Sequence, residues 1–383
     1  MSNTQDTSAN TGATGQAPEA FREDTAFQVR DGIHSPEVLR LSTAETHVVD
    51  FGGIYSPSLK DRQAVGQAFR EAFTGPGYLV LKNHQFPQSV ITRARAAMEG
   101  FFSLSVEDKM KCHYLDWPDH RGYVPLEGIN ADHSLMGGDM SEAIEMAEDL
   151  PADDPDHLRG IRFYGPNNWP MSPADFRWAL GTYYDCQIEL GRHIMRAFEY
   201  ALETDEGFFT SKYTKPLSRT RVCHYPPQGA PVPSQEDAPE GAASPASASG
   251  PDGDIDMTHI GIGAHTDYEC FTTVWQDAEG LQMLGADGRW RMVPAMEGAF
   301  AVNLGDLMQI WTNDQFKSTL HRVINTSGRD RYSLVQFFGV DYDIDVEPLR
   351  GTVSPDNPWR YEPIKAGQHS ENMVAATYHY DEE

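Results

Sequence analysis

Three residues in the last third of the chain have side chains that can together bind a metal ion. His265 and Asp267 are two positions apart, and His321 follows much later. If the first two residues lie on a β-strand, their side chains project from the same face and converge on one point. Two imidazoles and one carboxylate form the set that holds Fe(II) on one side and leaves the other side open. The spacing therefore predicts a non-haem iron site at His265, Asp267 and His321.

A second pair of residues follows His321 and has a different chemistry. Arg331 and Ser333 come ten and twelve residues after it, on a run that is otherwise apolar. The planar guanidinium fork of an arginine binds a carboxylate through two parallel hydrogen bonds. A serine two residues further along the same strand can donate a hydroxyl to the same group. A buried arginine needs a counter-charge, so the pair predicts a grip on the far carboxylate of an oxoacid.

Each of these signals alone has a simpler explanation. A His-x-Asp pair also occurs as a surface ion pair or as a satisfied core histidine, and Arg331 and Ser333 could be an ordinary surface arginine and strand serine. The prediction depends on the two signals occurring together, with the three possible metal ligands followed along the chain by Arg331 and Ser333.

The elements that must position these residues differ between the two halves of the chain. Before residue 210, strand-like runs alternate with helical patterns. The expected strands are 47–51 and 78–81, and the expected helices are 61–73, 89–102 and 173–202. After residue 219 the pattern changes to short β runs separated by Gly and Asp turns, at 220–224, 272–275, 281–284, 290–293, 299–303, 318–323 and 332–338. Many short strands with turn signals predict a jelly roll, here with N-terminal helices packed on it.

Two segments have the composition of chain that does not fold. Residues 1–20 are rich in Ser, Thr, Ala and Gly, and residues 229–256 consist mostly of Ala, Pro, Gly, Ser, Asp and Glu. Such segments bury too little apolar surface to offset the entropy of ordering. We therefore expect a polar extension over 1–40, an α/β region over 41–210, a jelly-roll core over 211–345 with a mobile acidic insertion, and a C-terminal extension over 346–383.

The amino-acid composition argues against some classes of binding partner. The formal net charge is −27, which argues against nucleic acid and against an anionic membrane surface. No apolar run is long enough for a membrane span, and the polar start lacks the pattern of a signal peptide. The four cysteines include no C-x-x-C pair, which is ordinary in a reducing compartment. We expect a cytoplasmic protein with a small-molecule substrate.

The order of the motifs resembles the isopenicillin N synthase-like branch of the Fe(II)/2-oxoglutarate-dependent oxygenases. The similarity runs from His47 to Phe338. It is most specific in the C-terminal part, and its main segments are VVDFGG, GYLVLKNH, RGYVP, HYPP, HTDYECFTTVWQD, VNLGDLMQIWTNDQFKSTLHRV and RYSLVQFF. The resemblance implies a double-stranded β-helix with flanking N-terminal helices. A His at position 224, where the family has another residue type, and the acidic insertion are the departures.

The resemblance also implies roles for individual residues. His265, Asp267 and His321 would bind Fe(II), Arg331 and Ser333 would hold the C5 carboxylate of 2-oxoglutarate, and Tyr225 would help to hold it. With dioxygen, such enzymes convert the oxoacid to succinate and carbon dioxide and oxidise a small organic metabolite, by hydroxylation, desaturation or ring closure. We expect N-terminal elements near 121–123 to line the substrate pocket together with Tyr268, Phe271 and Phe338, for which core packing is the simpler role, above all for Phe271.

Other functions fit parts of this pattern. An oxidase of the same fold that uses no oxoacid, of the isopenicillin N synthase or aminocyclopropane-carboxylate oxidase type, could keep Arg331 and Ser333 for a different carboxylate. Fragmentation of 2-oxoglutarate to ethylene is a further variant of the chemistry. A non-catalytic barrel that binds a small acid or a metal is the alternative outside enzymes.

Overall fold

The computed structural model describes residues 35, 37–42, 45–117, 121–129, 131, 138–228 and 260–377, which all belong to one compact unit. The expectations for 1–20 and 229–256 lie outside these residues.

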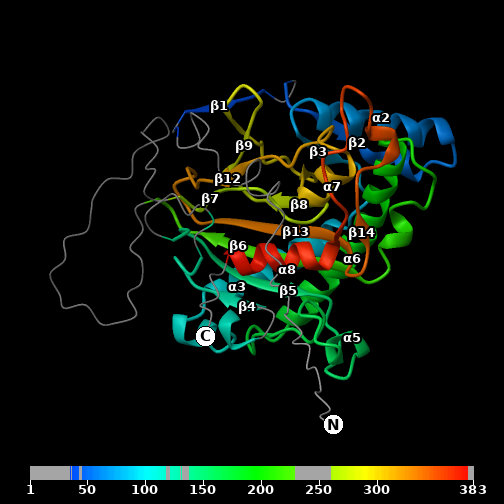
Figure 1. Cartoon of the computed structure of the whole chain (residues 1–383). Helices are drawn as coiled ribbons and strands as arrows, with labels where there is room; N and C mark the ends of the chain where they lie inside the picture. Colours follow the sequence, from blue (N-terminus) through cyan, green and yellow to red (C-terminus); the bar gives the residue numbers. More distant parts are fainter. Residues whose placement is uncertain are drawn as a thin grey trace, which may run out of the picture. The chain divides into compact units, whose positions relative to one another are not determined.

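Two β-sheets form the core of the described chain (Figure 1). The smaller has the order β1-β10-β9-β12-β7, with bounds Val38–Arg40, Trp290–Met292, Leu281–Leu284, His321–Val323 and Ile262–His265. The larger has the order β2-β3-β11-β8-β13-β6-β5-β4, with bounds Val48–Asp50, Tyr78–Lys82, Phe300–Leu304, Phe271–Gln276, Arg331–Asp341, Pro216–Tyr225, Glu142–Ala147 and Gly122–Val124. Strands from both halves of the sequence share this larger sheet.

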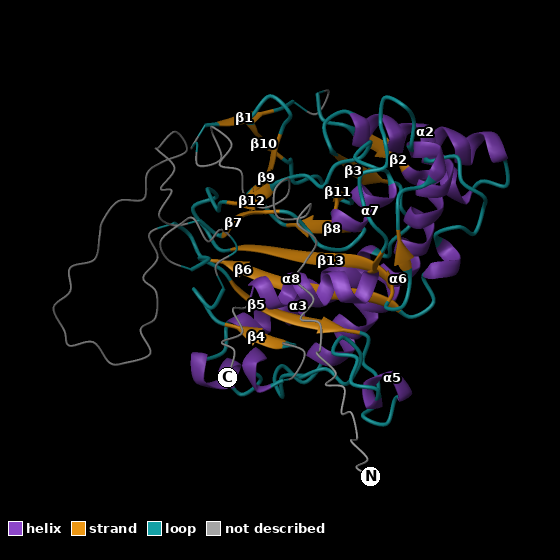
Figure 2. Ribbon diagram, viewed as in Figure 1, coloured by secondary structure: helices purple, strands orange, loops and turns teal. Residues whose placement is uncertain are grey.

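Helices come mostly from the N-terminal half (Figure 2). Their bounds are α2 Leu59–Thr74, α3 Gln88–Phe102, α4 Val106–Met110, α5 Pro155–Leu158, α6 Phe176–Ala201, α7 Asp306–Trp311 and α8 Ala366–Thr377. Short 3₁₀ turns lie at Phe51–Tyr55, Tyr114–Asp116, Thr210–Lys212 and Arg350–Thr352. Within the described residues no helix combines the length and the apolar character that crossing a membrane requires.

Side chains along the long strands alternate between two buried regions, one on each face of the larger sheet. On β13, Leu334 and Phe338 face the helices, whereas Ser333 and Val335 face the space between the two sheets, because successive side chains point to opposite faces. On the helix side, Phe338 stacks on Phe271 at 4.5 Å between ring centroids, and Phe271 contacts Phe198 of α6. The sheet is therefore covered by α6 on one face and encloses a cavity on the other.

The fold agrees with the jelly-roll prediction, and the strand and helix positions agree within a few residues. The predicted helix over 61–73 is α2, and the predicted helix over 173–202 is the shorter α6. The sequence patterns missed β4 and β5, and they left 346–383 as an extension. That segment contains the β14–β15 pair, Asp345–Val346 with Ile364–Lys365, and helix α8, which contacts β13. The division of the chain into four segments stays a prediction.

The contact between α2 and α6 depends on one glycine. A methyl group on Gly66 would lie 2.4 Å from Cβ of Tyr200 and 2.9 Å from the backbone nitrogen of Ala201. Backbone atoms cannot move aside as a flexible side chain can, so the two helices would have to separate. Gly181, inside α6, has nothing within 4 Å of the same position.

We predict that Gly66→Ala lowers the free energy of unfolding by about 1–3 kcal/mol, the usual cost of overpacking. Gly181→Ala is the matched control and should raise it by up to about 1 kcal/mol, because alanine favours helix over glycine. Urea unfolding followed by circular dichroism measures both. Equal effects of the two substitutions would contradict the helix contact as described.

Candidate metal centre and the cavity around it

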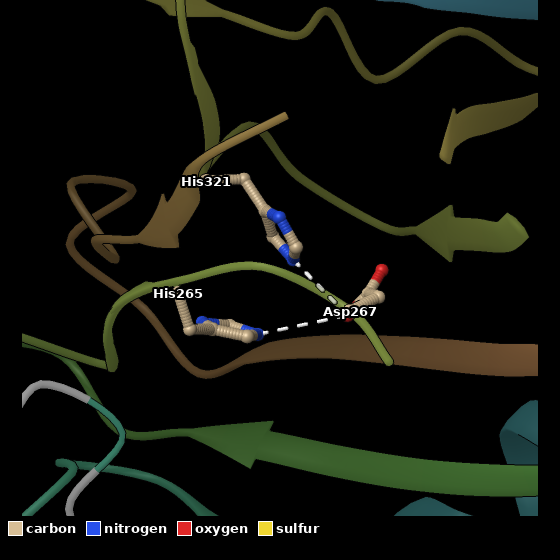
Figure 3. A group of neighbouring side chains, drawn as sticks. All are labelled: His265, Asp267 and His321. Atoms are coloured by element: carbon tan, nitrogen blue, oxygen red, sulfur yellow. Dashed lines mark ion pairs between the residues drawn. The ribbon is translucent and has the colours of Figure 1, made fainter. Parts of the chain in front are cut away.

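The three predicted ligands meet at the edge of the smaller sheet, which provides the two histidines. His265 is the last residue of β7, and His321, the first residue of β12, is paired directly opposite it. Nε2 of His265 lies 3.8 Å from Oδ1 of Asp267, and Nε2 of His321 lies 3.6 Å from the same oxygen. Figure 3 shows both rings directed at this carboxylate. All three ligand atoms lie within 4.8 Å of one another.

Asp267 reaches the site differently from the prediction. We expected His265 and Asp267 on one strand, but β7 ends at His265, and Asp267 forms an isolated bridge with Gly305. The hydroxyl of Thr272 and the side-chain amide of Asn303 both donate to Oδ2 of Asp267, each at 2.6 Å. Because these bonds hold Oδ2, the other oxygen faces the imidazoles.

Each imidazole ring is oriented by a hydrogen bond from its Nδ1 atom to a backbone carbonyl. Nδ1 of His265 donates to the carbonyl of Gly263 at 2.8 Å, and Nδ1 of His321 donates to that of Thr319 at 3.0 Å. With Nδ1 protonated, Nε2 carries the lone pair that binds a metal. Burial lowers the pKa of His265 to about 4, and the charges of His321 and Arg221 add to this effect. The donor set and its protonation therefore fit a divalent iron with neutral imidazoles.

At the other end of the same cavity, Arg331 is fully buried. Its Nε donates to the carbonyl of Ala278 at 3.1 Å, one Nη donates to Oε1 of Gln276 at 2.7 Å, and its guanidinium lies 4.6 Å from the ring centre of Tyr225. Its other Nη is buried without a hydrogen-bond partner. In the described part of the chain, Arg331 forms no ion pair with a carboxylate.

The residues around Arg331 fit a carboxylate ligand. The hydroxyl groups of Tyr225 and Ser333 lie 3.2 Å apart, and both residues line the cavity with Arg331. Gly280 provides room for the guanidinium, since a methyl group there would lie 2.6 Å from its Nε. A buried guanidinium with an unused donor requires an anion, and an oxoacid with a terminal carboxylate supplies one.

One cavity, of about 140 Å³, connects the metal ligands with the Arg331 group. Apolar side chains line much of this cavity: Ile129, Ile262, Val274, Leu281, Val323, Val335, Phe337 and Val374. The wall also contains charged residues that the sequence patterns did not single out: Asp139, Glu145, Arg219, Arg221 and Glu269.

Three of the residues expected at the substrate side lie elsewhere. Tyr268 does line the cavity, but Phe271 and Phe338 are fully buried on the helix side of the larger sheet. Phe337 lines the cavity instead of Phe338, because neighbouring strand residues point to opposite faces. Arg121 is also buried away from the cavity, and it donates to the carbonyls of Phe163 and Gly165.

His224, the residue that departs from the family pattern, lies on the outer face of β6. Its two ring nitrogens bond to Glu142 at 2.8 Å and to Asp330 at 2.9 Å, and its ring stacks on Tyr332 at 4.9 Å. Glu142 also accepts from Lys109 at 2.6 Å. Burial alone would lower the pKa of His224, but the bonds to the two carboxylates outweigh it and raise that pKa above its usual value.

The hydrogen bonds of His224 lie on the opposite face of the sheet from Tyr225 and Arg331. In the pairing of β6 with β13, His224 is opposite Tyr332, and Tyr225 is opposite Arg331. The outer-face bonds therefore fix the ends of the two strands that carry Tyr225 and Arg331 on their inner face.

A jelly roll with this ligand set defines a class of iron-dependent oxygenases, and the comparisons with known proteins agree. The family described as 2OG-Fe(II) oxygenase superfamily matches residues 217–340, and the N-terminal family of non-haem dioxygenases in morphine synthesis matches residues 47–172. The 2-oxoglutarate-Fe(II) type oxidoreductase hxnY of Emericella nidulans is 31% identical over 336 residues, which cover 86% of this chain and 88% of that protein. The homoarginine-6-hydroxylase 2-ODD-C23 of Glycine max is 32% identical over 282 residues, which cover 73% and 78%.

Solved structures show the same fold. A 2OG-Fe(II) oxygenase family protein from Caulobacter crescentus matches with a TM-score of 0.69 and 26% identity, covering 86% of this chain and 98% of the other. Neurospora crassa T7H, in complex with alpha-KG and thymine, matches with a TM-score of 0.70 and 24% identity, covering 86% and 96%. The chain belongs to the 2OG-Fe(II) oxygenase superfamily and is a 2-oxoglutarate- and Fe(II)-dependent oxidoreductase.

The His224 network predicts a pH-dependent stability. Because the pKa of His224 is raised in the folded protein, its bonds stabilise the fold fully below the usual histidine pKa of about 6.5, and this contribution is lost as pH rises through the folded value. We expect the free energy of unfolding to fall as pH rises above about 6.5, and this part of the slope to disappear in His224→Phe.

Asp330→Asn, which removes the exposed partner, should weaken the slope without abolishing it. Urea unfolding of the three proteins across this pH range measures the difference. An identical pH dependence of the wild type and His224→Phe would contradict the role of the network.

Proposed function

We propose that His265, Asp267 and His321 bind the catalytic iron, and that Arg331, Ser333 and Tyr225 bind the terminal carboxylate of 2-oxoglutarate during oxidation of a small organic molecule. The observation that carries the proposal is the buried Arg331, which has an unused donor in the same cavity as the ligand triad. An arginine in this position favours a dicarboxylate that reaches from the guanidinium toward the metal ligands.

The roles of the protein's own groups follow from their contacts. Thr272 and Asn303 direct one oxygen of Asp267 toward the imidazoles, and the backbone carbonyls fix the tautomers of both histidines. Bound Fe(II) supplies the redox chemistry that couples decarboxylation of the oxoacid to oxidation of the substrate.

Substrate and co-substrate occupy different ends of the cavity in this proposal. The apolar side chains near Arg331 exclude water around the carbon chain of the oxoacid, which strengthens its bonds to the guanidinium. The opposite part, lined by Tyr268, Phe337 and Val374, is left for the molecule to be oxidised. Related enzymes accept small molecules, as the complex of Neurospora crassa T7H with thymine illustrates.

The general experiment measures succinate, 2-oxoglutarate and oxygen together, with purified protein, Fe(II) and a small-metabolite library. Succinate formed in step with oxygen consumed supports the proposal. Oxygen uptake without consumption of the oxoacid would identify an oxidase of the other kind, and ethylene from 2-oxoglutarate would identify the fragmentation reaction.

We predict that Asp267→Ala weakens iron binding by more than about 100-fold, beyond the effect typical of residues that only orient a ligand. The fold should remain, because Asp267 lies in the connection between β7 and β8 and not within either strand. Calorimetric titration with Fe(II) under nitrogen and circular dichroism check both points. Asp287→Ala, at an exposed ion pair with Arg291, is the control and should bind iron like the wild type. Unchanged affinity in Asp267→Ala would rule out the ligand assignment.

For Arg331→Ala we predict an increase of about 100-fold in the concentration of 2-oxoglutarate needed for half-maximal turnover, because a buried charge pair is broken. Rates of succinate formation as a function of 2-oxoglutarate concentration measure it. Arg289→Ala, on an exposed turn, should leave the requirement unchanged. The proposed grip is wrong if both variants show the wild-type dependence.

A further inference from the structure

Two arginines stand in the cavity wall beyond the carboxylate grip. Arg219 and Arg221 alternate with outward-facing residues of β6 and lie on the same face as Tyr225. In the pairing with β13, Arg221 is opposite Val335 and Arg219 is opposite Phe337, and all four residues line the cavity. Along this face of β6, Arg221 and then Arg219 therefore lie at increasing distance from Tyr225, which is at the end proposed to bind 2-oxoglutarate.

Glu145 of β5 holds both arginines in place. Its Oε1 accepts from Nη1 of Arg221 at 2.5 Å, and its Oε2 accepts from Nη2 of Arg219 at 2.7 Å. The three side chains are buried, with exposed fractions of 6% for Glu145, 11% for Arg219 and 12% for Arg221. One carboxylate thus bridges two guanidinium groups and fixes the orientation of their planes.

The other acidic groups of the wall are placed for different contacts. Asp139 accepts from the backbone nitrogen of Gly263 at 2.9 Å and from that of Ala131 at 3.3 Å. Glu269 lines the main cavity and, together with Arg219, a smaller neighbouring one, which Arg221 and Glu145 do not reach. Both guanidinium groups line the main cavity, and Arg221, unlike Arg219, does not also line the smaller one.

Apolar side chains also line this part of the cavity, beside Asp139 and Glu269. Ile129, Val335, Phe337 and Val374 line it, and Val374 comes from α8, the helix that contacts β13. A fixed guanidinium fork favours a planar pair of oxygens, and the apolar side chains favour a hydrocarbon body. A ligand that satisfies both is a carboxylic acid with an apolar carbon skeleton.

We propose that the substrate is a small, largely apolar carboxylic acid, whose carboxylate is bound by Arg221 with Arg219, while Glu145 positions the two guanidinium groups. The inference rests on the proposed function, since it assigns Arg331 to 2-oxoglutarate and leaves Arg221 to the substrate. Arg221 then determines specificity by holding the acid group while the apolar body extends toward the metal ligands.

The test is calorimetric binding to the Fe(II)-loaded protein under nitrogen with saturating 2-oxoglutarate, so that no turnover occurs. The compounds are benzoic, phenylacetic, hexanoic and octanoic acids, each beside its primary amide. We expect at least one acid to bind at least about tenfold more tightly than its amide, because charge-assisted hydrogen bonds are stronger than neutral ones. An acid whose binding is lost at saturating 2-oxoglutarate but present without it binds at Arg331 and counts against the proposal.

Substitutions test which residues cause the preference for an acid over its amide. Arg221→Gln should bring the affinities for acid and amide close together, and Arg221→Lys should keep part of the preference because it keeps the charge. Glu145→Gln should keep the preference for the acid, since it removes a competing carboxylate. Arg177→Gln, at a surface ion pair with Asp149, is the control and should bind like the wild type. Thermal unfolding identifies any variant that fails to fold.

Several results would overturn the inference: no acid binds, acids and amides bind equally, or the preference survives in Arg221→Gln. These outcomes are distinct from failure of the proposed function, because acid binding is measured without turnover. An acid preference that depends on Arg221, without any succinate from a bound acid, would preserve the inference and refute the oxygenase reaction.

Discussion

The pairing of β12 with β7 is the interaction on which the site depends. It sets His321 directly across from His265, so two imidazoles far apart in the sequence face one another with ring centres 4.2 Å apart. Both strands are short: β12 has three residues and β7 has four. The neighbouring strand β9 holds β12 from its other side and completes this part of the sheet.

Asp267 joins the pair through the other sheet. Its carboxylate is bonded by Thr272 at the start of β8 and by Asn303 on β11, both strands of the larger sheet. The three proposed iron ligands therefore lie where the two sheets meet, and a bound metal would link the sheets. A rolled sheet provides this arrangement because it brings strands distant in the sequence to opposite walls of one cavity.

The strands β6 and β13 carry the polar chemistry of that cavity on one face and a hydrophobic or ion-paired layer on the other. Inward-facing positions provide Tyr225, Arg221, Arg331 and Ser333. Outward-facing positions provide either aromatic packing against α6, as at Phe338, or the bonds of His224 with Glu142 and Asp330. Buried charges on the inner face are tolerated because each has a fixed partner or a place for one.

The sequence by itself determined the jelly roll and predicted the ligand triad and the pair Arg331 and Ser333, because each depends on residue type and on the two-residue repeat of a strand. It could not determine that β7 ends before Asp267, or that β5 places Glu145 beside Arg219 and Arg221, because neither follows from local spacing. Phe337 rather than Phe338 faces the cavity because the register of β13 is set by its neighbours β6 and β8. Only tertiary structure decides which face of a strand is enclosed, since that depends on what packs against it.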